Sequence, residues 1–495
     1  MHIVHISSEL APVAKVGGLA DVVLGLSREH VSQGHSVQII LPKYDCLHQR
    51  DIKNFKVLPE TFEVYYDGVE HTVQAWSGTV QDVPTYFIEG FAPKSFFNRN
   101  LIYGSSDDID RFTYFARAAL DFLNQTERVP DIIHLHDWPT ALVAPLLREA
   151  FADRPIADAK IVLTIHNIEY QGQCAPEHLD RVGLPGVELM HSGKLSDNYR
   201  PDLVNLLKGG IVYSDFFTTV SPTYAQEILT PAQGRGLENT IQQFANKFAG
   251  ILNGIDYSYW DPEKDPLLTE HYSYEQLAKH NWEGKERAKK DLQERLNLIV
   301  ERRPLIGCVS RLVPQKGIHL LEHAMVHTQL LGGQFVLLGT SPSASIQAQF
   351  ERIKLANATN RNLHLCLRTS EELAHQIFAG CDMILVPSVF EPCGLTQMIA
   401  MRYGAVPLVR RTGGLADTVF DIETSKMPEE ITNGFTFDDA DFSGVNWGID
   451  RAVALWRDTP ERWRHLIVKG MKQDYSWTRS ANQYLEVYSN IIAIP

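Results

Sequence analysis

The sequence predicts an α/β protein of two Rossmann-like, doubly wound domains that face a central cleft. Apolar, strand-like runs alternate with helical stretches through both halves, as expected for parallel sheets covered on both faces. The 495 residues are too many for a single core, which favours two domains of similar size. The letters GGLAD also recur after an apolar run in each half, at 17–21 and 413–417. Strand, glycine turn and helix thus repeat in both halves.

The first half holds five apolar runs that predict parallel strands. A helix is expected over 109–123, between two of these runs. From 55 to 88 the pattern changes to short alternating strands, which predicts an inserted hairpin or meander. The five strands are expected at 2–7, 36–41, 131–136, 161–166 and 216–220.

The second half repeats this alternation, with strands expected at 304–309, 334–338, 363–367, 382–386 and 405–409. The strand pattern pauses in the turn-rich segment 257–266, so the domain boundary is placed after Asp256. The predicted domains are 1–256 and 257–478, and 479–495 is expected to form a helix that packs back on the first domain. Because ligands bind at the carboxyl ends of parallel strands, a site shared by both domains is expected in the cleft between them.

Composition narrows the class of protein. Hydrophobic residues make up 44% and charged residues 21% of the chain, which is ordinary for a globular enzyme. With 46 Lys and Arg against 60 Asp and Glu, the formal net charge is −14, and no basic tract is present. Nucleic acid and anionic membranes are therefore poor candidates for partners. Six scattered cysteines, an N-terminus without a signal-peptide core and no membrane-spanning run favour a reduced, cytoplasmic setting.

The first glycine turn has the features of a phosphate site. Lys15 stands just before Gly17 and Gly18, and the amides of a first helical turn can face an anion there. Glycine also occurs in tight βα turns for purely steric reasons. For the second copy, Gly413 and Gly414, this steric interpretation is favoured.

A second candidate site follows the strand expected at 304–309. Arg311 and Lys316 lie on one loop, and Gly317 opens a helix. Two cations beside a helix start suit a diphosphate, whose charge rises as a bond to it breaks. The alternative interpretation is a solvated basic turn.

A third candidate site follows the strand expected at 382–386. Glu391 is held between Phe390 and Pro392 on a stiff turn, and 394–396 offers the amides of a helix start. A carboxylate fixed in this way can bind sugar hydroxyls or stabilise positive charge on a sugar ring. The alternative is a helix cap, although Ser, Thr, Asp and Asn are commoner than Glu in that position.

A histidine-rich segment raises the question of a metal. His134 and His136 share one face of a strand, but nothing at ligand spacing supplies a third ligand. The Asp-x-Asp pairs at 108–110 and 439–441 match a motif of metal-dependent sugar transferases. We interpret them instead as acidic helix starts and turns. We therefore expect neither a metal nor a cofactor.

Eight segments together resemble bacterial glycogen synthases and plant starch synthases, in the order found in that family. The segments are KVGGLAD, HLHDW, TIHNIEYQG, VSPTYAQEI, ILNGID, SRLVPQKG, VPSVFEPCGLTQ and RRTGGLADTV, and the resemblance covers essentially the whole chain. It implies a GT-B fold. It also implies a retaining transfer of glucose from ADP-glucose to the non-reducing end of an α-1,4-glucan such as glycogen.

The resemblance implies roles for individual residues as well. The first domain would hold the acceptor, and the second would hold the nucleotide sugar. The donor would contact Lys15, Gly17, Gly18, Arg311, Lys316, Gly394, Leu395 and Thr396. The catalytic group would be Glu391, Arg311, Lys316, His166 and Cys393. The donor glucose would be lined by His166, Asn167 and Asn253, and the acceptor would face Asp137, Trp138 and Tyr103.

Two positions depart from patterns seen in related enzymes. Ile399 stands where many retaining GT-B enzymes carry a second Glu, a lack that glycogen synthases share. Arg368 and Thr369 replace the Gly-Tyr pair that the family usually has near the adenine, and they are assigned to the donor site. This replacement makes UDP-glucose an alternative donor.

A protein of the same fold that binds glucan or nucleotide sugar without catalysis is the competing hypothesis. Such a protein would be expected to lose the cations or the carboxylate, whereas Lys15, Arg311, Lys316 and Glu391 are all present. A GT-B epimerase or a sucrose-type synthase should lack the HLHDW and YQG segments.

Overall fold

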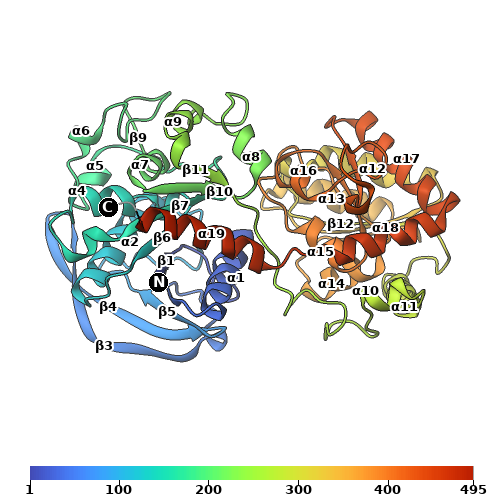
Figure 1. Ribbon diagram of the computed structural model, residues 1–495, viewed down its shortest axis with the longest axis horizontal. Coiled ribbons are helices and arrows are strands. Elements are labelled where there is room, and N and C mark those ends of the chain that lie inside the picture. Colours follow the sequence, from blue (N-terminus) through green and yellow to red (C-terminus); the bar gives the residue numbers. More distant parts are fainter. Residues whose placement is uncertain (494–495) are drawn as a thin grey trace. The chain divides into compact units, whose positions relative to one another are not determined.

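The structure, a computed structural model, describes residues 1–493 and divides into two compact units (Figure 1). Unit 1 comprises Met1–Gly254 together with Trp477–Pro495, and unit 2 comprises Ile255–Ser476. Each unit is an α/β body with its own large sheet. Residues 494–495 of the expected C-terminal helix lie outside the described residues.

Unit 1 is built on a sheet that has nine strands within the described residues, in the order β11-β10-β7-β6-β1-β2-β5-β4-β3. Neighbouring strands from β11 to β5 run parallel, whereas β4 is antiparallel to β3 and β5. This confirms the hairpin or meander expected between 55 and 88, but the expectation of short strands is wrong, because β3 and β4 are 14 and 12 residues long. The strands are β1 (His2–Ile6), β2 (Ser36–Pro42), β3 (Lys53–Tyr66), β4 (Val69–Val80), β5 (Val83–Ile88), β6 (Ile132–His136), β7 (Lys160–Ile165), β10 (Phe216–Thr219) and β11 (Phe248–Gly250). A separate ladder pairs β8 (Gln173–Cys174) with β9 (Val204–Asn205).

Unit 1 also contains the helices that connect these strands, and the last helix of the chain packs in the same unit. In α19 the Trp477 indole packs against α1, where a Cβ at Gly25 would lie 2.0 Å from the indole Nε1 atom. The helices are α1 (Gly18–Ser32), α2 (Asp108–Gln125), α3 (Trp138–Ala141), α4 (Val143–Glu149), α5 (Glu177–Asp180), α6 (Gly186–Leu189), α7 (Leu206–Tyr213), α8 (Pro222–Glu227), α9 (Glu238–Gln243) and α19 (Trp477–Ile492).

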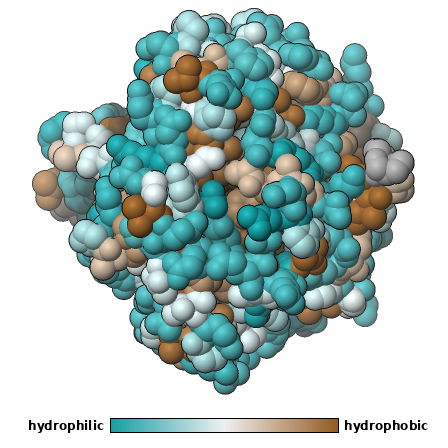
Figure 2. Space-filling model, turned by 90° about the vertical axis from the view of Figure 1, so that its left-hand side faces the viewer, coloured by the Kyte–Doolittle hydropathy of each residue, from teal (hydrophilic) through white to brown (hydrophobic). Residues whose placement is uncertain are grey.

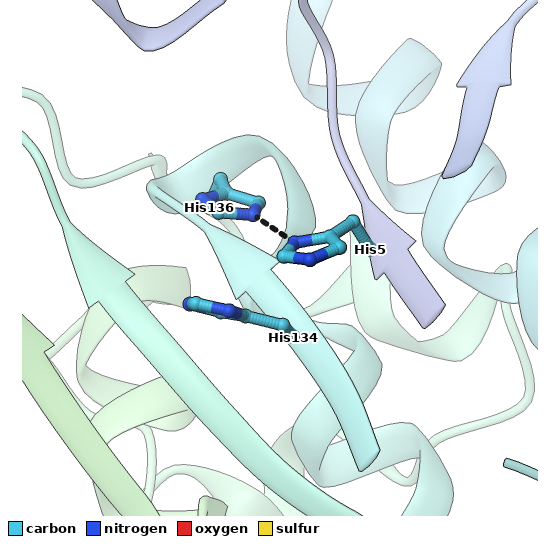
Figure 3. Close-up of side chains that lie close together, drawn as sticks. All are labelled: His5, His134 and His136. Carbon is cyan, nitrogen blue, oxygen red and sulfur yellow. Dashed lines mark hydrogen bonds between the residues drawn. The ribbon is translucent and has the colours of Figure 1, made fainter. Parts of the chain in front are cut away.

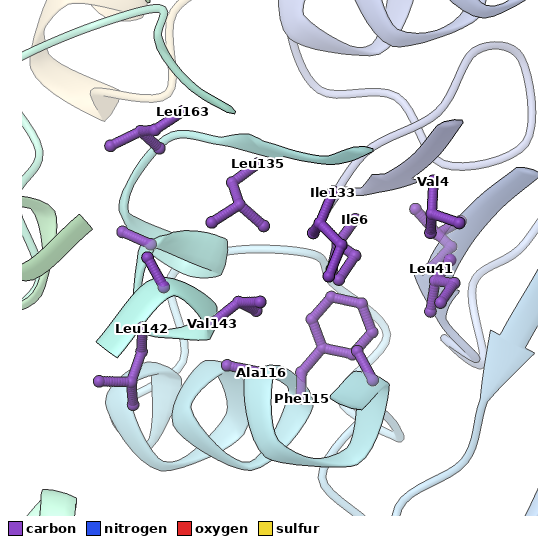
Figure 4. Close-up of a cluster of buried hydrophobic side chains, with 14 of the residues drawn as sticks. Val4, Ile6, Leu41, Phe115, Ala116, Ile133, Leu135, Leu142, Val143 and Leu163 are labelled. Carbon is purple, nitrogen blue, oxygen red and sulfur yellow. The ribbon is translucent and has the colours of Figure 1, made fainter. Parts of the chain in front are cut away.

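The two faces of the unit 1 sheet differ in character. On one face, aliphatic side chains of the central strands meet α2, as Figure 4 shows for Ile133, Leu135 and Phe115. Along β6 these residues alternate with His134 and His136, which therefore point to the opposite face. There the His134 ring contacts Tyr488 of α19. One face of the sheet thus carries an apolar core, and the other carries a buried polar layer.

Unit 2 is built on a parallel sheet that has six strands within the described residues, in the order β14-β13-β12-β15-β16-β17. The strands are β12 (Leu305–Val309), β13 (Gln334–Leu338), β14 (Leu363–Cys366), β15 (Met383–Val386), β16 (Val406–Arg410) and β17 (Phe435–Phe437). The helices are α10 (Tyr274–Ala278), α11 (Glu283–Arg295), α12 (Ile318–Leu330), α13 (Ala344–Ala356), α14 (Glu371–Gly380), α15 (Thr396–Arg402), α16 (Gly413–Thr418), α17 (Phe442–Asp458) and α18 (Pro460–Lys472).

The expected strands are confirmed, and their ends agree to within about one residue. The helix expected over 109–123 is α2. Strands β11 and β17 were not expected, because three residues are too few to show a strand pattern in the sequence.

The side of the surface seen in Figure 2 is mostly hydrophilic, and hydrophobic residues occur there in small separate groups. None of the helices in residues 1–493 combines the length and the apolar character needed to cross a bilayer.

Candidate active site

The expected site residues follow strands at the switch point of each sheet, which is the place where successive strands begin to be added on the opposite side. This point lies between β1 and β6 in unit 1, and between β12 and β15 in unit 2. Ligands of doubly wound sheets bind at the carboxyl ends of strands beside such a point. The first glycine turn and Asp137 follow β1 and β6, whereas Lys316 and Glu391 follow β12 and β15. The expected site residues therefore fall into two groups, one in each unit.

In unit 2, Lys316 and Glu391 form an ion pair. The Lys316 Nζ atom lies 2.5 Å from Oε2 and 2.8 Å from Oε1 of Glu391. The Ser388 hydroxyl donates to Oε2 at 2.8 Å. Glu391 is 6% exposed, so its buried charge is compensated by Lys316. Glu391 does not cap the following helix, because the N-cap of α15 is Leu395.

Backbone contacts hold the two loops of this pair together. The Val389 amide donates to the Gln315 carbonyl at 2.8 Å. Gly317 has a φ of +69°, and a Cβ there would lie 2.0 Å from the Pro387 carbonyl oxygen. Any side chain at Gly317 would therefore push the loops of Lys316 and Glu391 apart.

The second glycine turn packs against the Glu391 loop. A Cβ at Gly413 would lie 2.0 Å from the Glu391 carbonyl oxygen, and one at Gly414 would lie 2.0 Å from that of Cys393. The Gly414 amide donates to the Glu391 carbonyl at 3.0 Å. The steric interpretation of this glycine pair is confirmed, because two backbones approach closely here.

The remaining donor candidates of unit 2 surround this pair in the chain. Arg311 is exposed on the loop after β12. Cys393 is buried, and Gly394 has a φ of +74°, a conformation that favours glycine. Leu395 and Thr396 form the N-cap and the first residue of α15.

Arg368 and Thr369 lie at the carboxyl end of β14, the edge strand of the unit 2 sheet. Both residues are exposed. The preceding Leu367 carbonyl accepts from Gln347 at 3.3 Å, and Gln347 also accepts from the Ser341 amide at 3.0 Å. Gln347 thereby links this segment to the loop after β13. Both lie at the carboxyl ends of the strands, as does the Lys316 loop.

In unit 1, Glu9 occupies part of the first glycine turn. Its Oε2 accepts the amides of Val16 at 2.6 Å and Gly17 at 2.8 Å, and its Oε1 accepts the Tyr103 hydroxyl at 2.9 Å. Gly17 was expected to contact the donor, but the buried Glu9 carboxylate accepts its amide. An anion at this turn would therefore use amides from Gly18 onward. Our sequence reasoning missed Glu9, although its place just after a strand end was the available signal.

Lys15 is exposed beside the same turn. Its Nζ lies 2.7 Å from Asp21 Oδ1, and the two side chains are 49% and 37% exposed. Exposed pairs of this kind contribute little to stability. Lys15 thus remains accessible to a ligand at the start of α1.

Asp137 has an unusual backbone conformation at the end of β6. Its φ of 58° and ψ of −175° lie in a region that is essentially restricted to glycine. Its Oδ1 accepts the amides of His166 at 2.6 Å and Asn167 at 3.2 Å. Burial raises the pKa of Asp137 to about 7, although the two amides act in the opposite direction. Backbone strain and a perturbed carboxyl together indicate a functional position.

The acceptor candidates Trp138 and Tyr103 share a neighbour. Both rings contact Phe112 of α2, with ring centroids 5.3 Å and 5.8 Å away. Trp138 also lies on Gly172, where a Cβ would be 2.5 Å from the indole ring. Both aromatic residues are half-buried, so part of each stays exposed.

Asn253 follows β11 and is 6% exposed. Within residues 1–493, its Oδ1 atom has no hydrogen-bond partner. Leaving a buried amide oxygen unpaired costs free energy, which a hydroxyl of a bound sugar would offset.

A third histidine lies beside His134 and His136. His5 of β1 is the register partner of His134, and the three rings offer nitrogens within 4.8 Å of one another (Figure 3). A third ligand could only come from a distant part of the sequence, and the pairing of β1 with β6 brings His5 there. Burial lowers the pKa of His5 to about 3 and those of His134 and His136 well below 6.5, so all three rings are neutral.

The two Asp-x-Asp pairs belong to helix starts. Asp108 is the first residue of α2, and Asp441 caps α17 by accepting the Gly444 amide at 2.9 Å. Their interpretation as acidic helix starts and turns is confirmed.

Two doubly wound units carry an ion pair at one switch point and a partly buried carboxylate at the other, and together with two family models they identify a glycosyltransferase of the GT-B fold. A family model described as "Starch synthase catalytic domain" matches residues 2–243. A second model, "Glycosyl transferases group 1", matches residues 289–465. The chain belongs to the family of bacterial glycogen synthases and plant starch synthases.

Individual relatives span the whole chain. Glycogen synthase of Protochlamydia amoebophila is 52% identical over 500 residues, which cover 100% of both chains. Probable starch synthase 4 of Arabidopsis thaliana is 46% identical over 100% of this chain, which spans 47% of that longer protein. The catalytic domain of starch synthase IV from Arabidopsis thaliana, solved with ADP and acarbose, has a TM-score of 0.96 and 46% identity over 99% of each chain.

Proposed function

We propose that this protein transfers glucose from ADP-glucose to the non-reducing 4-hydroxyl of an α-1,4-glucan with retention of configuration, and thereby elongates glycogen. The observation that carries the proposal is the ion pair of the half-buried Lys316 with the buried Glu391, after the central strands of unit 2. A relative solved with ADP supports a nucleoside diphosphate as the leaving group.

In the proposed reaction the bond between the anomeric carbon and the diphosphate breaks. Lys316 and Arg311 stabilise the negative charge that develops on the diphosphate, and Glu391 stabilises positive charge on the sugar ring. The new bond to the glucan oxygen forms on the face from which the diphosphate departs. The hydroxyl proton passes to a diphosphate oxygen. Such a reaction needs cations and orienting groups more than an attacking carboxylate.

The residues of unit 1 orient the two sugars in this proposal. Asp137 fixes the His166–Asn167 turn through its two accepted amides. The unpaired Asn253 oxygen accepts from a hydroxyl of the donor glucose. Trp138 and Tyr103 offer the partly exposed aromatic surface on which a glucan ring can stack. Lys15 adds a cation for the diphosphate.

Incorporation of labelled glucose into glycogen, measured with ADP-glucose and UDP-glucose in parallel, tests the proposal. We expect incorporation from ADP-glucose. A folded protein that uses neither donor yet binds glucan would contradict catalysis and support the silent alternative.

Donor selectivity is expected to be modest and to depend on Arg368 and Thr369. An exposed Arg-Thr pair offers no ring that could stack on a purine. The double variant Arg368→Gly with Thr369→Tyr should raise the ratio of kcat/KM for ADP-glucose over UDP-glucose, by about 1 to 3 kcal/mol of discrimination. The KM for glucan is the control and should not change. If the natural protein strongly excluded UDP-glucose, or if the ratio of kcat/KM values stayed unchanged in the variant, other residues would determine which nucleotide base is bound.

Activity is expected to persist in excess EDTA. Lys15, Arg311 and Lys316 supply positive charge where metal-dependent transferases use a divalent ion. The measurement is turnover with ADP-glucose before and after chelation, with magnesium or manganese added back. Complete loss of turnover that either ion restores would refute this expectation.

We further infer a reducing, cytoplasmic setting. In the described part of the chain, none of the six cysteines forms a disulfide.

A further inference from the structure

A chain of hydrogen-bonded imidazoles runs from the interior of unit 1 to His166. His5 Nδ1 lies 3.0 Å from His136 Nε2 (Figure 3), and His136 Nδ1 lies 3.0 Å from His166 Nε2. His5 and His136 are fully buried, whereas His166 is half-buried. Because β1, β6 and β7 are neighbours in the sheet, the three rings link adjacent strand ends.

The three rings are neutral at pH 7. Burial lowers the pKa of His5 and of His166 to about 3, and that of His136 well below 6.5. A neutral imidazole has one N–H and one lone pair. All N–H groups in the chain must therefore point the same way, since one reversed ring would bring two N–H groups or two lone pairs face to face.

The surroundings of His5, at the buried end of the imidazole chain, favour N–H groups that point outward, from His5 toward His166. Within residues 1–493, His5 Nε2 has no hydrogen-bond partner. Inward-pointing N–H groups would leave a buried N–H at this atom, whereas outward-pointing ones leave only an unfilled lone pair. Orphaned buried N–H groups are the rarer of the two in proteins. The nearby His30 donates its Nε2–H to the Ala481 carbonyl at 3.3 Å, and its ring centroid is 6.4 Å from that of His5, too far for a direct bond.

We propose that His5 and His136 are positioning residues that hold His166 in the Nδ1–H tautomer, so that this N–H donates to the sugar of the donor. The inference rests on the proposed function, in which His166 lines the donor glucose. The choice of tautomer matters because the other form presents a lone pair to the sugar hydroxyl in place of an N–H. A wrong histidine tautomer can abolish most of an enzyme's turnover even when the geometry is intact.

A cation bound by His5, His134 and His136 is the competing use of these rings. Hydrogen bonds favour the imidazole chain instead. Both nitrogens of His134 are already bonded, to the hydroxyls of Tyr488 and Thr164 at 2.7 Å each. Both nitrogens of His136 belong to the chain. A metal ion would have to replace several of these bonds.

The tautomer of His166 is measured directly by NMR on the full-length, ligand-free protein labelled with 15N-histidine. The His166 signals are assigned by their loss in His166→Gln. We expect protonation at Nδ1 in the natural protein, and a shift toward protonation at Nε2 in His136→Met, whose thioether sulfur can accept a hydrogen bond but cannot donate one. Protonation of His166 at Nε2 in the natural protein, or an unchanged tautomer in His136→Met, would overturn the proposal. This measurement does not depend on the donor, so it can fail or succeed independently of the proposed function.

Kinetics separate positioning from a merely structural role. His136→Leu should lower kcat/KM for the donor by about tenfold to hundredfold, the effect of a mispaired buried polar contact. His136→Asn should recover most of this loss, because the Asn amide can donate near the position of Nδ1. On a His166→Ala background, His136→Leu should cause no further loss. Fully additive losses would overturn the proposal.

The matched control is His134→Leu, on the same strand and in the same buried layer but outside the chain. It should lower the Tm while leaving the His166 tautomer and kcat/KM unchanged. Metal content of the purified protein completes the test: stoichiometric zinc that depends on His5 and His136 would replace the proposed chain by a metal site.

Discussion

Replacing Lys316 with alanine is expected to lower kcat by about 100-fold to 1,000-fold, equivalent to ~3 to 4 kcal/mol of lost transition-state stabilisation. The variant loses one of the cations that we propose to stabilise the departing diphosphate. It also leaves the buried Glu391 carboxylate with Ser388 as its remaining partner from this group. Glucan affinity should change far less, because the proposed acceptor residues lie in unit 1. Steady-state kinetics and a glucan-binding assay on the same preparations measure both effects.

Arg311→Ala should act in the same direction, since Arg311 shares the loop. The control is Lys290→Ala in α11, a half-exposed lysine whose Nζ lies 3.7 Å from Glu294 and which has no place in the site. Its turnover should match that of the natural protein. Near-normal turnover in both Lys316→Ala and Arg311→Ala would contradict the assignment of this loop to the diphosphate.

Asp137→Asn is expected to lower turnover by about tenfold to hundredfold and yet to stabilise unit 1 at neutral pH. The asparagine oxygen can still accept the amides of His166 and Asn167, but it has no charge to offer the acceptor hydroxyl. The stability gain follows from the pKa of about 7, compared with the ordinary value of 3.8. A carboxyl with a raised pKa favours the folded state only while it is protonated. Its ionisation therefore opposes folding increasingly as the pH rises from about 4 to 7.

The expected difference in stability between Asp137→Asn and the natural protein is small at pH 5, grows up to pH 7 and levels off above it. We expect about 1 to 3 kcal/mol at pH 8, less than the full pKa shift implies because the residue is only partly buried. Thermal unfolding at pH 5, 6, 7 and 8 measures it. A constant difference at all four pH values would mean that Asp137 does not titrate in this range.

Most of the fold could be predicted because its strands are apolar runs bounded by turns. The site loops could be located for the same reason, since they follow those strands. The ion pair of Lys316 and Glu391 joins residues 75 positions apart, and each was singled out alone. Their pairing depends on β12 lying beside β15, which no local pattern records.

The residues missed by sequence reasoning share a physical cause. Glu9 bonds amides seven and eight positions later, through a loop whose path the sequence does not specify. His5 meets His134 only through the register of two strands that lie 129 positions apart. Both residues are buried polar groups, and burial of a polar residue becomes visible only when its partners are in place.

The return of α19 to unit 1 also sets an order for folding on the ribosome. Tyr488 bonds His134 across 354 positions of sequence, and Trp477 and Tyr484 belong to the same core. The first 254 residues of unit 1 are therefore synthesised long before the helix that closes their polar layer. Unit 2 is continuous in sequence and can complete its sheet earlier, the reverse of the usual order in which N-terminal domains fold first. A chain that stops short of Trp477 would leave the histidine layer of unit 1 uncovered while unit 2 remained whole.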